Sequence, residues 1–211
     1  MRVRPGLSEK RLLAASGALN GLPGTKHRRE ALWQAELPFH DDLFACSVRE
    51  KEADYQVFTP LPAMTAEELL DADLDCQGAT TGPHPMALWR RRMEDGGHAV
   101  MESGPPTASA LGAFDHGTPV NIAGLVICRQ RPSTAKGHCF ITMEDETGIA
   151  NWFVPKKTFE LYRQTITTHA YLLARGRVQI AEGGQATVFV TGLEALPGTA
   201  GFSAPHSHDF H

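Results

Sequence analysis

The feature that most constrains the fold is the alternation of side chains in two neighbouring segments, 137–144 and 149–154. Every second position suits a buried face, and these residues are Cys139, Ile141, Met143, Ala150, Trp152 and Val154. The residues between them, which include Phe140 and Phe153, fall on the opposite face. A period of two predicts β-strands with one face toward a core. The Asp145-Glu-Thr-Gly148 run between the segments predicts the turn that joins them.

The order of the predicted elements specifies an architecture. Three strands, a helix and two further strands follow one another, at 120–129, 137–144, 149–154, 155–163, 171–179 and 187–193. This is the order of the OB fold, a five-stranded barrel that binds oligonucleotides or oligosaccharides. We therefore expect an α+β chain in which an OB barrel follows a helical helix-hairpin-helix remnant and an irregular linker region.

An OB barrel binds single strands on its second and third strands and in the adjacent loops. Aromatic side chains stack bases there, and cations contact the phosphates. The candidate nucleic-acid-binding residues of the barrel are Arg129, Arg131, Lys136, Phe140, Asn151 and Phe153. The sequence leaves one alternative open, in which Phe140 and Phe153 are buried against the preceding domain.

Residues 1–36 have apolar side chains at helical spacing, which the Gly21-Leu-Pro-Gly24 run interrupts. Helix, glycine-containing hairpin, helix is the pattern of a helix-hairpin-helix element, which presents backbone N–H groups to a phosphate. Arg28 and Arg29, at the start of the second helical segment, are the candidate DNA contacts of this region. The alternative is an ordinary helical pair with a solvated basic face.

The distribution of charge favours a nucleic-acid partner more than the total charge does. The chain has 211 residues and a formal net charge of −4. Residues 1–40 carry 7 basic and 3 acidic side chains, and residues 120–192 carry 8 and 5. Residues 41–119 carry 5 basic and 14 acidic side chains. Two basic segments flank an acidic one, so a basic face can coexist with the acidic total.

These patterns divide the chain into four predicted segments. We expect a helix-hairpin-helix remnant at 1–36, an acidic connecting region at 37–119, the OB domain at 120–193 and a C-terminal tail at 194–211. Within the connecting region, Thr65-Ala-Glu-Glu68 predicts a capping box that starts a short helix.

Leu43 and Phe44, also in the connecting region, resemble a short peptide that docks into a hydrophobic pocket of a partner. The same pair can equally pack on its own chain. Docking to a partner protein and packing on its own chain therefore both stay open as interpretations of this pair.

Composition excludes some classes of function. No apolar run approaches the roughly 20 residues that span a bilayer, and no signal-type segment follows Met1. We therefore expect a cytoplasmic protein without a membrane partner. The four cysteines contain no Cys-x-x-Cys pair, and the histidines at 206, 208 and 211 lie in a tail. We expect neither a metal nor a cofactor.

Two runs of the barrel segment, 124–137 and 140–151, closely resemble the OB domain of bacterial C-family, polymerase III alpha-like DNA polymerases. The resemblance is to their error-prone branch in particular. Residues 12–33 resemble the end of the family's helix-hairpin-helix region, and Ser207-His-Asp-Phe-His211 resembles the C-terminus of the error-prone branch. The resemblance implies the C-terminal part of an error-prone polymerase, which binds single-stranded or primer–template DNA in DNA repair and translesion synthesis.

The resemblance also implies a limit on activity. The family's PHP domain, catalytic palm and fingers have no counterpart in these 211 residues, and Met1 falls inside the helix-hairpin-helix region. Nucleotidyl transfer uses carboxylates that hold two metal ions about 4 Å apart, and the acidic segment 41–119 has no such arrangement. We expect the chain alone to be a non-catalytic fragment. Two alternatives stay open, an adaptor that docks a replication partner such as the sliding clamp and an inactive gene remnant.

Overall fold

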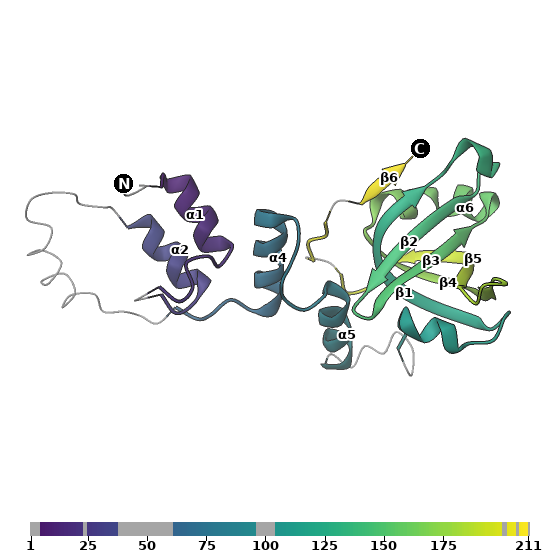
Figure 1. The fold of residues 1–211 in the computed structure, drawn as a ribbon, viewed down its shortest axis with the longest axis horizontal. Helices are drawn as coiled ribbons and strands as arrows, with labels where there is room; N and C mark the ends of the chain where they lie inside the picture. Colours follow the sequence, from purple (N-terminus) through teal and green to yellow (C-terminus); the bar gives the residue numbers. More distant parts are fainter. Residues whose placement is uncertain are drawn as a thin grey trace, which may run out of the picture. The chain divides into compact units, whose positions relative to one another are not determined.

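The computed structural model describes residues 5–22, 25–37, 61–95, 104–199, 202–205 and 207–210. Contacts divide the chain into two compact units, Met1–Gln77 and Gly78–His211, and each is described by itself. Figure 1 shows helices in the first unit and a β-barrel with further helices in the second. Within the described ranges, no helix combines the length and apolar character that crossing a membrane requires.

The first unit contains three described helices, α1 (Leu7–Ala15), α2 (Arg28–Glu36) and α4 (Ala66–Gln77). The two helices predicted within 1–36 are present, and turns follow α1. A glycine is required at position 17 for two reasons. Its φ is +81°, and a Cβ there would lie 2.7 Å from Nε of Arg28. The turn after α1 therefore leaves room for the Arg28 side chain.

The N-terminus of α4 has the predicted capping box. The hydroxyl of Thr65 accepts a hydrogen bond from the Glu68 N–H at 3.2 Å, and the Glu68 carboxylate accepts one from the Thr65 N–H at 2.8 Å. These bonds satisfy N–H groups that have no partner within the helix. The helix extends to Gln77, and its Asp73 carboxylate is buried in an ion pair with Arg28.

The second unit is built around a closed barrel (Figure 1). Its strands are β1 (Pro119–Gln130), β2 (Cys139–Asp145), β3 (Gly148–Val154), β4 (Tyr171–Ile180) and β5 (Ala186–Ala195). The strand order is β2-β3-β5-β4-β1, and pairing of β1 with β2 closes the barrel. The β3–β5 pair is parallel, and the other pairs are antiparallel. The predicted five-stranded OB barrel is confirmed.

The helix between the third and fourth strands, α6 (Lys156–Thr168), is longer than predicted. The sequence pattern ended it at residue 163, but the helix continues because Ile166 is fully buried in the barrel core. The predicted inner face is correct. Its six residues are all at most 4% exposed: Cys139, Ile141, Met143, Ala150, Trp152 and Val154.

One end of the outer face of β1 and β4 is covered by α5 (Pro85–Asp95) and by residues that follow β5. Trp89 of α5 is 2% exposed, and its indole N–H donates to the Pro197 carbonyl at 2.7 Å. Around it lies a second apolar cluster with Met86, Ala123, Leu125, Tyr171, Leu173 and Leu196 as buried members. The compact unit that contains the barrel begins at Gly78, because α5 buries its apolar side on the barrel.

Arg90 of α5 anchors the turn between β2 and β3. Its guanidinium lies 2.5 Å from the Glu146 carboxylate and 3.5 Å from that of Asp145, and Nη1 donates to the Pro105 carbonyl at 2.6 Å. The Asp145 carboxylate is buried and accepts hydrogen bonds from the Ala108 N–H and from the N–H and hydroxyl of Thr147. These hydrogen bonds satisfy the buried carboxylate and fix the turn between β2 and β3.

His84 lies immediately before α5, and we expect its imidazole to make the folded protein less stable in mild acid. Burial lowers the pKa of its imidazole below the ordinary 6.5, although the carboxylates of Glu144, Glu146 and Asp145 oppose this shift. Its Nδ1 accepts the Met86 N–H at 3.1 Å, and a proton there would remove that bond. The unfolded chain therefore gains the proton first, and stability falls as pH drops from about 6.5 toward the lower folded pKa.

Urea denaturation between pH 7.5 and 5 checks this prediction. The wild-type chain should lose more stability over this interval than His84→Asn, whose amide can accept the same N–H but does not titrate. Equal pH dependence in the two proteins would show that His84 is not the group responsible.

Candidate nucleic-acid interface

Three phenylalanines form a row across the outer face of β2, β3 and β5. Phe140 is paired with Phe153 across β2 and β3, and Phe153 with Phe189 across β3 and β5. The ring centroids are 5.4 Å apart in the first pair and 5.6 Å apart in the second. Phe140 is 42% exposed, and the other two are half-buried. The predicted outward direction of Phe140 and Phe153 is thus observed.

His138 extends the row at the end of the β1–β2 loop. Its ring lies 5.0 Å from that of Phe153, and its Nδ1 accepts the Lys156 N–H at 3.0 Å. This hydrogen bond fixes the imidazole beside the first turn of α6. Phe153 therefore contacts three rings, those of His138, Phe140 and Phe189, and is the centre of the aromatic row (His138, Phe140, Phe153 and Phe189).

A polar row runs beside the aromatic one on the same face. Thr142 is paired with Asn151, and Asn151 with Thr187 of β5. The Thr142 hydroxyl donates to the Asn151 carbonyl oxygen at 3.1 Å, which orients the amide. Asn151 is half-exposed, so its amide N–H groups lie next to the stacking surface, where they can donate to a base edge.

The loop between β1 and β2 supplies cations at the end of this face. Its short helix η2 (Ser133–Ala135) ends at Lys136, which is exposed and has a left-handed backbone with φ of 50°. The Arg131 guanidinium lies over the Phe159 ring at 4.5 Å, which holds it against α6 while it stays partly exposed. Arg131 also lines a groove of about 300 Å³ with Pro132, Ser133 and Gly137.

Arg129 has a different environment from Arg131, two residues away. Its side chain is 12% exposed and donates to the carbonyls of Ile166 and His169, both at 2.7 Å. It also donates to the Ser207 hydroxyl at 2.5 Å and pairs with Asp209 at 3.3 Å. Ile166 and His169 lie at the C-terminal end of α6, whose carbonyls lack helical partners. These contacts support a structural role for Arg129.

Arg129 also contacts two residues near the C-terminus, Ser207 and Asp209, beside a short strand. Residues 194–211 were predicted to be a tail, but within them β6 (His208–Phe210) pairs in parallel with β1 at Cys128 to Gln130. The pairing occurs where β4 no longer accompanies β1, so it supplies backbone partners to an otherwise open edge.

The predicted DNA contacts of the helical unit are engaged in ion pairs. The Arg28 guanidinium is 12% exposed, lies 2.5 Å from the Asp73 carboxylate and donates to the Ala15 carbonyl. Arg29 lies 2.5 Å from the more exposed Glu68. For Arg28, these contacts favour the alternative interpretation, an ordinary helical pair rather than a helix-hairpin-helix element. The proposed docking residues Leu43 and Phe44 lie outside the described residues.

Two members of the aromatic row, His138 and Phe189, were not among the predicted site residues. Alternation along the predicted strand 187–193 places Phe189 opposite the inward Val188 and Val190, so its direction was available from the pattern. Its position beside Phe153 was not available, because that depends on the parallel pairing of β3 and β5.

Near this face, the structure gives little support for a reactive thiol or a metal site. Burial raises the pKa of the Cys139 thiol to about 11, so it is protonated and unreactive at neutral pH. In the part of the chain that the structure describes, no group of three His, Cys, Asp or Glu side chains is arranged to hold a metal ion.

The barrel matches a known family over nearly its whole length. Residues 120–196 match the family described as OB-fold nucleic acid binding domain. Over 201 residues, the chain is 38% identical to an error-prone DNA polymerase of Anaeromyxobacter sp. (strain K), with 94% of this chain and 16% of the relative aligned. It is 35% identical to the error-prone DNA polymerase of Pseudomonas paraeruginosa, with 99% and 19% aligned. The chain is a relative of the error-prone DNA polymerases. The predicted resemblance is confirmed.

The chain spans less than a fifth of the length of these relatives. This agrees with the predicted correspondence to one part of them. Among solved structures, asparaginyl-tRNA synthetase from Pyrococcus horikoshii has 24% identity and a TM-score of 0.37, with 44% of this chain and 22% of that chain covered. A similarity this low adds nothing to the assignment.

Proposed function

We propose that this chain is the single-stranded template-binding part of an error-prone, translesion and repair polymerase, and that its barrel holds the strand on the aromatic row. The observation that carries the proposal is the contact of Phe153 with the rings of His138, Phe140 and Phe189 on an open barrel face. The relation to error-prone DNA polymerases and the OB-fold nucleic-acid-binding domain support a DNA-binding region.

The energetics favour binding that tolerates many sequences. Stacking on an aromatic side chain contributes about 1–3 kcal/mol per base whatever the base. Arg131 and Lys136 at one end of the row add phosphate contacts, whose strength falls with salt. The polar row contributes one oriented amide, Asn151, so we propose that base identity has a weak effect.

The polymerase reaction itself is assigned in this proposal to other parts of the relatives. The chain aligns with 16–19% of their length, which leaves the larger part to supply nucleotidyl transfer. We propose that this chain, in the cytoplasm, contributes DNA binding without catalysis of its own. The alternative of an adaptor for the sliding clamp rests on Leu43 and Phe44, which lie outside the described residues.

Fluorescence anisotropy with a labelled oligothymidine and the full chain tests this function. The binding constant should fall as the salt concentration rises. The slope of its logarithm against the logarithm of the salt concentration should be near −0.7 for each phosphate neutralised on a single strand. Lys136→Asn should reduce that slope, because it removes one cation while asparagine tolerates the left-handed backbone at this position. Glu160→Gln, an exposed carboxylate on α6, is the control and should not reduce the slope. No binding at low salt would contradict the proposal.

A further inference from the structure

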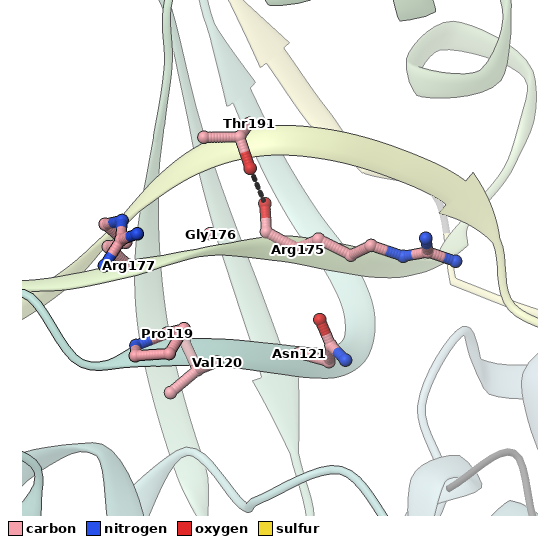
Figure 2. Close-up of a pocket in the computed structure, with 7 residues that line it drawn as sticks. All are labelled: Pro119, Val120, Asn121, Arg175, Gly176, Arg177 and Thr191. Atoms are coloured by element: carbon pink, nitrogen blue, oxygen red, sulfur yellow. Dashed lines mark hydrogen bonds between the residues drawn. The ribbon is translucent and has the colours of Figure 1, made fainter.

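A second basic surface lies on the barrel where β1, β4 and β5 run side by side. A groove of about 290 Å³ lies there. Figure 2 shows the residues that line it, which are Pro119, Val120, Asn121, Arg175, Gly176, Arg177 and Thr191. Arg175 and Arg177 are both exposed and occupy alternate positions of β4, so both side chains project from the outer face of the barrel. We call this the β4 groove.

The β4 groove continues the aromatic row. Phe189, the last ring of the row, is directly paired with Arg177 across β5 and β4. Phe140, Phe153, Phe189 and Arg177 therefore occupy matching positions on four successive strands. Neighbouring strands are about 4.8 Å apart, so the distance from Phe140 to Arg177 is that of a few nucleotides of extended single strand.

The close approach of β4 to β5 depends on Gly176. A Cβ at this position would lie 2.3 Å from the Phe189 carbonyl oxygen. The pairing of the two strands also shifts register between Arg175 and Gly176, as in a β-bulge. The Thr191 hydroxyl donates to the Arg175 carbonyl at 3.2 Å beside this irregularity (Figure 2). The bulge is therefore held in place next to the two arginines.

The existing partners of the two arginines leave them able to bind an anion. Arg175 pairs with Glu194 at 2.9 Å, but both side chains are about half-exposed, and such a surface pair is weak. Arg177 donates from Nη1 to the Gly117 carbonyl at 2.9 Å. A guanidinium has further N–H donors that suit phosphate oxygens.

We propose that the β4 groove is a phosphate subsite for the same single strand, which crosses the barrel from the β1–β2 loop over the aromatic row to Arg177 and Arg175. This inference rests on the proposed function and adds the strand's path and a minimum length. An oligonucleotide that covers only the rings does not reach the groove, and a longer one does.

Binding of two oligothymidines to the full chain tests the path. One has about 2 nucleotides, too short to extend from Phe140 to Arg177, and the other has about 12, within the range found for single OB folds. Arg175→Ala/Arg177→Ala should weaken the longer one about tenfold and lower its salt slope by about 1.4, the value for two phosphates on a single strand. The shorter one should change less than about twofold. Arg91→Ala/Arg163→Ala removes the same charge from exposed positions of α5 and α6 and is the control.

The outcomes separate the two proposals. Equal loss for both lengths, or the same loss in the control variant, would show a general charge effect and overturn the subsite. An unchanged affinity for the longer oligonucleotide would overturn it as well. If the wild-type chain binds neither length, the proposed function fails and the subsite fails with it. Thermal melts of both variants, matched to the wild type, exclude misfolding as the cause of a loss.

Discussion

Phe153→Leu should weaken single-strand binding by about tenfold or more, since stacking contributes about 1–3 kcal/mol per base. Phe153 has the largest effect because its ring contacts His138, Phe140 and Phe189 and keeps the row continuous over β2, β3 and β5. Leucine retains most of the apolar volume of the side chain but has no π face. Anisotropy titrations at fixed low salt measure the change.

The control for this prediction is an exposed apolar residue away from the aromatic row. Leu161 on α6 is 75% exposed, and Leu161→Ala should leave the affinity unchanged. Circular dichroism melts establish whether Phe153→Leu stays folded at the temperature of the titration. A folded Phe153→Leu protein with wild-type affinity would show that the aromatic row does not hold the strand.

Trp89→Ala should destabilise the barrel by about 3–5 kcal/mol, the range for removal of a buried tryptophan. The indole is 2% exposed in the cluster between α5 and the outer face of β1 and β4, so alanine leaves a cavity there. It also removes the hydrogen bond to the Pro197 carbonyl. Because a typical domain is stable by only about 5–15 kcal/mol, guanidinium unfolding monitored by the β-sheet signal should detect the shift readily.

Trp89→Phe separates the two contributions of this residue. It keeps an aromatic ring in the cluster and loses the indole N–H, and should cost about 1–3 kcal/mol because the Pro197 carbonyl is left without that donor. Arg91→Ala on the exposed side of α5 should change stability by less than about 0.5 kcal/mol. If Trp89→Ala leaves the unfolding of the barrel unchanged, α5 is not part of the same cooperative unit.

The capping box and the alternating strands were predictable because both depend on short-range geometry. Thr65 and Glu68 satisfy N–H groups within one helical turn, so three-residue spacing was sufficient. The period of two in β2 and β3 separated buried Trp152 from half-exposed Phe153. The packing of α5 on the barrel could not be predicted, because it depends on Trp89 and Pro197, which are more than one hundred residues apart in the chain.

The arginines show where sequence patterns stop being informative. Arg129 and Arg131 lie in one basic run, and nothing in that run distinguishes them. In the fold, Arg129 caps the end of α6 and pairs with Asp209, whereas Arg131 lies over Phe159 and stays partly exposed. Arg28 likewise meets Asp73 from a helix 45 residues away. Whether a cation is available to DNA depends on which distant carboxylates and carbonyls the fold brings to it.

The sequence by itself determined the order of strands and helix along the barrel segment, its inner face and its relation to error-prone DNA polymerases, because alternation and motif identity are local properties of the chain. Only the tertiary structure decided which face stays open and how far the aromatic row extends. α5 covers β1 and β4 at one end, while the parallel pairing of β3 with β5 places Phe189 between Phe153 and Arg177. Residues from three separate strands thereby form one surface, which their spacing along the chain does not predict.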